Sequence, residues 1–317
     1  MILVLGASGY IGQAFVAELR RRKASHVTLG RSEVDYSRFE VLLAHLRKTR
    51  PTFVINAAGY IGKPNVDACE SAKAETLLGN VVLPVTITNA CAEAGIPWGH
   101  VSSGCIYNGA KVREKDGWRL ETDLTRPEVR RRFENGPEAF AGYNEEDEPN
   151  FSFRHPPCSF HNGTKVLAEE AIRHSGQGLI WRLRIPFDEF DGPRNSLGKL
   201  QRYPKVYDNI NSFSHRGDFV RACLDLWERK APFGIYNVTN PGAISTRQIV
   251  ALIARILKPS RSFEFFADDQ EFYNVGVKAP RSNCILDVGK LLATGISMRP
   301  VAEAFEDALE NWKPAAA

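Results

Sequence analysis

Two short segments carry side chains that could do chemistry. The first runs from Phe160 to Lys165 and places His161 four residues before Lys165, about one turn away if the segment is helical. The second runs from Ser102 to Cys105. An imidazolium donates protons near neutral pH, because its reference pKa is about 6.5, and a nearby lysine would lower that pKa by like charge. The two segments therefore predict an acid–base site.

A glycine-rich loop opens the chain. It follows the apolar run Met1 to Leu5 and precedes a helical pattern from Ile11 to Arg22. Such a loop lets backbone amides approach a pyrophosphate, which a side chain would block. We therefore favour dinucleotide binding over tight packing alone. The residues expected to contact the dinucleotide are Gly6, Ser8, Gly9, Tyr10, Ile11 and Gly12.

The cofactor preference is predicted from the end of the second expected strand. An NAD site would place a carboxylate there, against the ribose hydroxyls, whereas this chain has Gly30-Arg31-Ser32. A cation and a hydroxyl suit a 2′-phosphate, so NADP(H) is favoured and NAD(H) stays open. The alternative for Arg31 is a surface side chain that stacks on adenine without selecting the phosphate.

Composition sets further limits. The 317 residues carry a net charge of only +4, with basic residues spread out, so nucleic acid is not an expected partner. No apolar stretch is long enough to span a membrane, and Met1 to Leu5 is too short for a leader. The six cysteines are scattered, which predicts reduced thiols, a cytoplasmic location and no metal site.

Strand and helix patterns alternate along the chain. This alternation predicts an α/β protein with a Rossmann-type doubly wound parallel sheet and a smaller α/β substrate-binding lobe. The expected Rossmann domain covers 1–180 and 213–240, with an irregular insertion at about 108–157, and the expected lobe covers 181–212 and 241–317. Expected strands are 1–6, 26–29, 52–57, 98–102, 179–186 and 234–238, and expected helices are 11–22, 39–48, 77–94, 163–174, 219–228, 246–257 and 301–312.

The order of the glycine loop, Asn56-Ala57-Ala58-Gly59, Ser102-Ser103 and Lys165 resembles that of the extended short-chain dehydrogenase/reductases. Within them the chain is most similar to the dTDP-4-dehydrorhamnose reductase branch, and there to the plant and viral nucleotide-rhamnose synthases, which are 3,5-epimerase/4-reductases. The blocks that carry this similarity are 59–70, 102–107, 146–151, 193–195 with Lys199, 237–242 and 279–283. Two features depart from the family: the 108–145 insertion, and His161 at the usual tyrosine position.

The resemblance implies an NADP(H)-dependent 4-ketoreductase for a nucleotide-linked 4-keto-6-deoxy sugar, bifunctional if the epimerase step is present. Lys165 would hold the nicotinamide ribose and Ser103 would polarise the carbonyl. Cys105 and Lys199 match the positions of the epimerase acid and base. The alternative for Cys105 is a small buried apolar residue, and the alternatives for Lys199 are a substrate phosphate contact and a surface charge. The cofactor would also contact Asn56, Ala57 and Ala58.

For the substrate, the resemblance implies contacts in the smaller lobe and beside the acid–base site. Arg281 is expected to contact the diphosphate, with a structural salt bridge as the alternative. His215 and Asp218 are expected to cap a helix. A homodimer is left open. The full expected substrate set is Ser103, Gly104, Asn195, Lys199, Arg202 and Arg281, with a backbone contact as the alternative for Asn195.

Three functional hypotheses follow from the histidine. In the first, His161 is the general acid and reduction persists, with turnover falling above about pH 7. In the second, Cys105 and Lys199 epimerise the sugar while NADP(H) is structural. In the third, the chain is a non-catalytic, cofactor-binding regulatory subunit. In a less favoured alternative, Tyr107 or Tyr143 supplies the proton in place of the family tyrosine.

Overall fold

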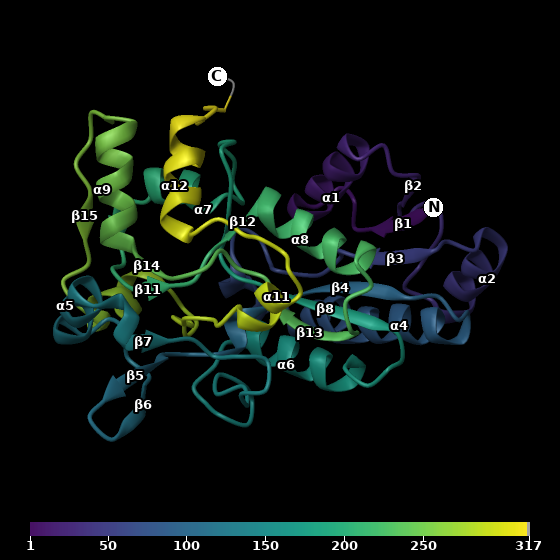
Figure 1. The fold of residues 1–317 in the computed structure, drawn as a ribbon, viewed down its shortest axis with the longest axis horizontal. Coiled ribbons are helices and arrows are strands. Elements are labelled where there is room, and N and C mark those ends of the chain that lie inside the picture. The colour runs from purple at the N-terminus through teal and green to yellow at the C-terminus, as the bar shows by residue number, and fades with distance from the viewer. Residues whose placement is uncertain (316–317) are drawn as a thin grey trace.

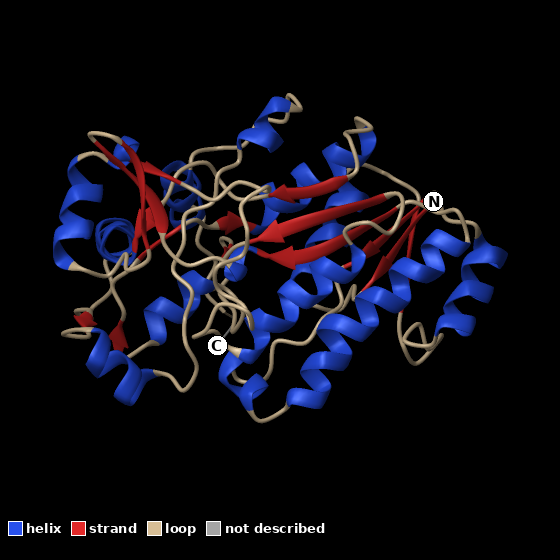
Figure 2. Ribbon diagram, turned by 90° about the horizontal axis from the view of Figure 1, so that it is seen from below, coloured by secondary structure: helices blue, strands red, loops and turns tan. Residues whose placement is uncertain are grey.

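A computed structural model describes residues 1–315, and its centre is a parallel sheet. From one edge to the other, the strands are β2 (His26–Leu29), β1 (Ile2–Leu5), β3 (Phe53–Asn56), β4 (Trp98–Ser103), β8 (Gly178–Leu183) and β13 (Gly234–Asn237). All neighbouring pairs in this sheet are parallel (Figure 2). The predicted doubly wound parallel sheet is confirmed.

Helices cover both faces of the sheet, because its strands are apolar on both sides. Ile2 and Val4 pack into one core, whereas Leu3 and Leu5 pack into the other. On the first face lie α1 (Tyr10–Arg21), α8 (Arg216–Glu228) and α11 (Gly289–Ala293), and on the second lie α2 (Phe39–Thr49), α4 (Leu83–Glu93) and α6 (Phe160–Ile172) (Figure 1).

A separate core fills the smaller part of the molecule, at the left of Figure 1. Phe187 and Phe305 stack there with ring centroids 3.8 Å apart. Its elements are β9 (Pro186–Phe187), α7 (Ser196–Arg202), β10 (Lys205–Val206), β11 (Ile210–Asn211), β12 (Ser214–His215), β14 (Ile244–Ser245), α9 (Thr246–Ile256), β15 (Glu264–Phe265), α10 (Asp269–Glu271), η5 (Phe272–Gly276) and α12 (Val301–Glu310). The exact domain limits stay a prediction.

The segment 108–157 has more regular structure than its sequence predicts. It forms an antiparallel sheet of β5 (Ala110–Glu114), β6 (Gly117–Glu121) and β7 (Phe140–Ala141), with α5 (Pro127–Asn135) and the short η4 (Pro137–Ala139). Val112 and Phe140 pack against Ile210 and Ile285. The alternation of buried and exposed residues here is too short to stand out in a polar segment.

The helix predicted over 77–94 is interrupted. It consists of α3 (Lys73–Leu77), a π-helical turn η2 (Leu78–Val82) and α4. At the turn, Asn80 bonds both backbone groups of Tyr60, at 2.8 Å each, and a Cβ on Gly79 would lie 2.7 Å from Tyr60 Cβ. This close approach favours the local change of helical pitch. Two 3-10 turns, η1 (Val66–Glu70) and η3 (Gly104–Ile106), both contact α6.

Candidate active site

The glycine loop joins β1 to α1 and leaves room only for backbone. A Cβ on Gly6 would lie 2.5 Å from the Ala58 amide nitrogen, and one on Gly12 would lie 2.0 Å from the Gly6 carbonyl oxygen. Gly6 also has a φ of +75°. Gly9 is the N-cap of α1, and within residues 1–315 no side chain caps this helix, so its first amides can bind an anion. This geometry fits a dinucleotide pyrophosphate.

The end of β2 carries both a cation with a neighbouring hydroxyl and a carboxylate. Arg31 and Ser32 are exposed there, as a 2′-phosphate site requires. Glu33, which the sequence did not single out, accepts a hydrogen bond of 2.7 Å from the Gly30 amide. The residues present fit NADP(H), and the Glu33 carboxylate keeps NAD(H) open.

Ser103 and Cys105 lie at the carboxyl end of β4, where parallel sheets of this type bind ligands. The Ser103 hydroxyl accepts a hydrogen bond of 3.2 Å from the Cys105 amide and starts the turn η3. Gly104 packs closely here, because a Cβ on it would lie 2.4 Å from Leu286 Cδ1.

The helix α6 brings His161 and Lys165 to the same place. Ser159 caps this helix, because its hydroxyl accepts from the Asn162 amide at 3.2 Å. His161 Nδ1 lies 4.0 Å from Cys105 Sγ, so the two predicted segments meet. A Cβ on Gly59 would lie 3.7 Å from Lys165 Nζ, which places the lysine near the end of β3.

The protonation of His161 is set by burial. Its Nδ1 lies 3.2 Å from Asn162 Oδ1, so Nδ1 carries the hydrogen and Nε2 keeps its lone pair. Nε2 is buried and has no hydrogen-bond partner within residues 1–315. Burial, and next Lys165, lower the pKa of His161 to about 4. The predicted effect of Lys165 has the right sign, but burial is the larger cause, so the expected decline near pH 7 moves to lower pH.

Burial also shifts the pKa values of Lys165 and Cys105. It lowers the pKa of Lys165, against the opposing effect of Cys105 and Glu169. It raises the pKa of the Cys105 thiol, against hydrogen bonding from Ser103 and the charges of Arg184 and Lys165. At neutral pH, Cys105 is therefore a protonated thiol.

Tyr107 and Tyr143 have structural roles. The Tyr107 hydroxyl donates to the Asp147 carbonyl at 2.7 Å and accepts from Arg182 at 3.0 Å. The Tyr143 hydroxyl donates to the Asn108 carbonyl at 2.7 Å, and the two rings stack. The idea that either phenol replaces the missing tyrosine is therefore not supported.

Lys199 lies among cations. Burial, and next Arg194, Arg202 and Arg281, lower its pKa. Arg281 forms an ion pair of 2.7 Å with Asp67, and Arg202 forms one of 2.6 Å with Asp191. The salt bridge foreseen as the alternative for Arg281 is thus present, while its phosphate contact stays a prediction.

Asn195 is placed differently from the other substrate candidates. Its side chain is completely buried and caps α7, because Oδ1 accepts from the Leu197 amide at 2.9 Å. Its Nδ2 donates to Asp188 and Phe190. Both polar atoms are thus used inside the protein, so Asn195 is a structural residue in this conformation.

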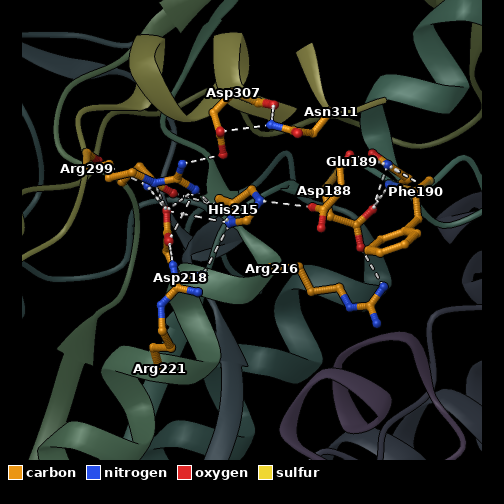
Figure 3. A network of polar contacts seen from close by, with 12 residues as sticks. Asp188, Glu189, Phe190, His215, Arg216, Asp218, Arg221, Arg299, Asp307 and Asn311 are labelled. Carbon is orange, nitrogen blue, oxygen red and sulfur yellow. Dashed lines mark hydrogen bonds and ion pairs between the residues drawn. The ribbon is translucent and has the colours of Figure 1, made fainter. Parts of the chain in front are cut away.

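A polar network surrounds His215 and Asp218 and extends to Asp188 and Arg216 (Figure 3). His215 caps α8, with Nδ1 accepting from the Asp218 amide at 3.3 Å, which confirms the predicted cap. Arg216, next in sequence, forms an ion pair of 2.5 Å with Asp188 and lies 4.4 Å from the Tyr10 ring centroid. Tyr10 is thus held by the start of α8 as well as by its own helix.

The described residues contain no candidate metal site and no membrane-spanning helix. Within 1–315, no group of three or more His, Cys, Asp or Glu side chains is placed to hold a metal ion. In the same range, no helix is both long enough and apolar enough to cross a membrane.

A glycine loop at the switch point of a doubly wound sheet, with an acid–base pair beside it, defines the class of dinucleotide-binding α/β proteins. Within this class, residues 1–313 match the family described as the RmlD substrate binding domain, and the chain belongs to this family.

Several known proteins are similar over most of the chain. The bifunctional dTDP-4-dehydrorhamnose 3,5-epimerase/dTDP-4-dehydrorhamnose reductase of Arabidopsis thaliana is 31% identical over 91% of this chain and 85% of its own length. The L780 UDP-rhamnose synthase of Acanthamoeba polyphaga mimivirus has a TM-score of 0.80 at 21% identity, covering 98% of both chains. A dTDP-4-dehydrorhamnose reductase from Bacillus anthracis, solved in complex with NADP, has a TM-score of 0.74 at 18% identity, covering 98% of this chain and 97% of that one.

Proposed function

We propose that the chain is an NADP(H)-dependent 4-ketoreductase of a nucleotide-linked 4-keto-6-deoxy sugar in rhamnose-like biosynthesis, with 3,5-epimerase activity at the same site. The observation that carries the proposal is the meeting of His161, Lys165 and Cys105 at the carboxyl end of β4, in a chain of this family. The name of its Arabidopsis thaliana relative, a bifunctional 3,5-epimerase/reductase, supports the same reaction.

In the reduction, bound NADPH supplies a hydride to the sugar ketone. Ser103 polarises the carbonyl oxygen by hydrogen bonding. His161 donates the proton to this oxygen from Nε2, the ring nitrogen that has no partner within the described chain. Lys165 holds the cofactor ribose and, by its charge, makes the imidazolium a stronger acid. Arg31 and Ser32 receive the 2′-phosphate.

In the epimerisation, Lys199 acts as the base and Cys105 as the acid. The pKa of Lys199 is lowered by burial and by neighbouring arginines, which favours the neutral amine that can remove a proton beside the ketone. Cys105 rests as a thiol and can return a proton on the opposite face. Arg202 and Arg281 would neutralise the substrate diphosphate.

The deciding experiment incubates the protein with a dTDP- or UDP-linked 4-keto-6-deoxyglucose and NADPH in deuterated water. We expect NADPH oxidation together with deuterium at ring carbons C3 and C5. The variant Lys165→Met serves as a control that should lose NADPH oxidation. The proposal fails if neither NADPH oxidation nor ring deuterium appears with any nucleotide, and a stable protein partner in a pull-down would then favour the regulatory subunit.

A second candidate is an epimerase in which NADP(H) is structural. The low pKa of His161, about 4, favours it, because only about one imidazole in a thousand carries a proton at pH 7. In the same experiment, ring deuterium without NADPH oxidation would identify this activity.

We also propose a homodimer and a cytoplasmic location. Leu78 and Val82 are 59% and 48% exposed on η2, a turn that packs against α6, where Leu167 is also exposed. Light scattering should give twice the chain mass, and Val82→Glu should halve it. The location is supported by the cysteines, which are all free thiols within residues 1–315.

A further inference from the structure

Arg184 is a buried cation that the proposed mechanism does not use. It follows β8 directly and is 5% exposed. Its Nη2 donates to the Ser282 carbonyl at 2.5 Å and to Asn211 Oδ1, while its buried Nε has no hydrogen-bond partner within the described chain. A buried charge without a counter-ion is costly, so this guanidinium needs an anion at some stage.

Carboxylates do not supply that anion in this conformation. Glu169 pairs with Arg182, Asp188 with Arg216 and Asp67 with Arg281. Among the ion pairs formed within residues 1–315, none includes Arg184. Its positive charge therefore remains available to a group that becomes negative during a reaction.

Two cysteines lie close enough to Arg184 for its charge to act on their thiols. Ser103 of β4 pairs with Leu183 of β8, so Gly104 and Arg184 leave the sheet as neighbours, and Cys105 is next. The Cys284 amide donates to Asn211 Oδ1 at 2.9 Å, the same oxygen that Arg184 contacts. The charge of Arg184 favours the thiolate form of both cysteines.

Cys105 is the thiol that can use this charge. Its Sγ lies 4.0 Å from His161 Nδ1, inside the acid–base site, whereas the Cys284 thiol donates to the Gly104 carbonyl at 3.3 Å. We propose that Arg184 is a positioning residue that stabilises the Cys105 thiolate formed when this thiol protonates the sugar carbon. This inference rests on the proposed epimerase step.

The step is balanced in protons. Lys199 takes a proton from the carbon beside the ketone, and the electron pair of the broken C–H bond forms an enolate. The Cys105 S–H bond then breaks, its proton forms the new C–H bond on the opposite face, and its electron pair stays on Sγ beside Arg184. The Lys199 ammonium finally returns a proton to the thiolate through solvent.

The test uses the matched variants Arg184→Gln, which removes the charge, and Arg184→Lys, which keeps it. The pH titration of thiolate ultraviolet absorbance is compared with that of Cys105→Ser, so that the difference isolates Cys105 from the other cysteines. The other groups that act on this thiol are Lys165 and His161 from α6, together with Ser103, Cys158 and Cys284. They are unchanged in all variants.

We expect Cys105 to titrate about one pH unit or more higher in Arg184→Gln, and near the parent value in Arg184→Lys. Deuterium incorporation into the substrate should fall about tenfold or more in the glutamine variant and recover in the lysine variant. An unchanged Cys105 titration in Arg184→Gln, even with slower exchange, would overturn the proposal and assign Arg184 to the substrate.

If Arg184→Gln does not fold, the variant Asn211→Asp is titrated in its place. This change places a carboxylate against Arg184 and should raise the Cys105 titration in the same way, and an unshifted titration again overturns the proposal. Because the titration needs no substrate, it distinguishes failure of this inference from failure of the proposed function.

Discussion

At the scale of single residues, the proposed reduction depends on the histidine that stands in place of the family tyrosine. A phenol beside a lysine remains a proton donor through neutral pH, whereas the buried His161 has a pKa of about 4 and is mostly neutral there. Reduction by this site is therefore expected to be fastest in mild acid and to weaken steadily as the pH rises.

The variant His161→Tyr should restore a donor that stays protonated at high pH. We expect NADPH oxidation at pH 8 to increase by about tenfold or more, because a well-placed general acid contributes this much. His161→Phe has a similar size and no donor, and should show no gain. Equal rates in the two variants would mean that the residue at position 161 does not supply the proton.

His161 also makes stability depend on pH. The pKa of His161 is about 4 in the folded protein and about 6.5 in the unfolded chain. Between these two pH values the imidazole is protonated in the unfolded chain and neutral in the folded protein, so a fall in pH favours unfolding. Stability falls from pH 6.5 towards pH 4, by about 3 kcal/mol in total. Urea unfolding of His161→Gln between pH 7 and 5 should show a smaller loss than the parent, and equal losses would contradict this assignment.

At the scale of elements, the glycine loop depends on contacts between backbone segments. A methyl group at Gly12 would lie 2.0 Å from the Gly6 carbonyl oxygen, so Gly12→Ala must move the loop away from α1. We expect NADPH affinity to fall by about tenfold or more. Gly192→Ala is the matched control, because a Cβ there meets no atom of residues 1–315 within 4 Å. Calorimetry of both variants with NADPH measures the difference.

The elements predicted best from the sequence are those whose signals are local. The helix predicted over 246–257 is α9 (Thr246–Ile256), and Ser245 caps it with a complete capping box to Gln248. The strand and helix around the glycine loop also agree with their predicted limits. The π-helical turn at Leu78–Val82 could not be predicted, because it depends on Tyr60, which lies far away in sequence.

The candidate site was predictable in part, because part of its signal also lies in local sequence motifs. Motif order places Ser103, Cys105, His161 and Lys165 together, since strand ends meet at one edge of a parallel sheet. Burial depends on the whole fold, so the sequence underestimates the shift of the His161 pKa and leaves open whether Asn195 contacts the sugar or the backbone. Arg184 was missed, although a charged residue inside the predicted strand 179–186 was a visible signal; the observed strand β8 ends one residue before it.

At the scale of the whole molecule, a buried ion pair joins the sheet to its covering helix. Glu169 of α6 pairs with Arg182 of β8 at 2.7 Å, and the same carboxylate accepts from the Ser102 hydroxyl of β4 at 2.5 Å. Arg182 extends this network to the Tyr107 hydroxyl. One charged cluster thus fixes the helix that carries His161 and Lys165.

Removing that charge should destabilise the entire protein. Glu169→Gln leaves Arg182 buried without its counter-ion, and we expect a loss of about 3 to 5 kcal/mol in unfolding free energy. Glu170→Gln is the adjacent control, and its more exposed pair with Arg154 should cost less than about 1 kcal/mol. Chemical unfolding of both variants measures this difference. Similar losses of unfolding free energy would show that the buried pair stabilises the protein no more than the exposed one.

The segment 108–157 lies against the smaller core through Val112 and Phe140, and within residues 1–315 it adds no strand to the parallel sheet. The sheet and its glycine loop are therefore expected to keep their shape when residues 110–141 change. The rest of the segment is tied to the dinucleotide-binding part, because Glu145 accepts a hydrogen bond of 2.7 Å from the Asn237 amide of β13 and Arg154 pairs with Glu170 of α6. Insertions or deletions between β5 and β7 would then reshape the surface beside the smaller core while leaving the cofactor loop in place.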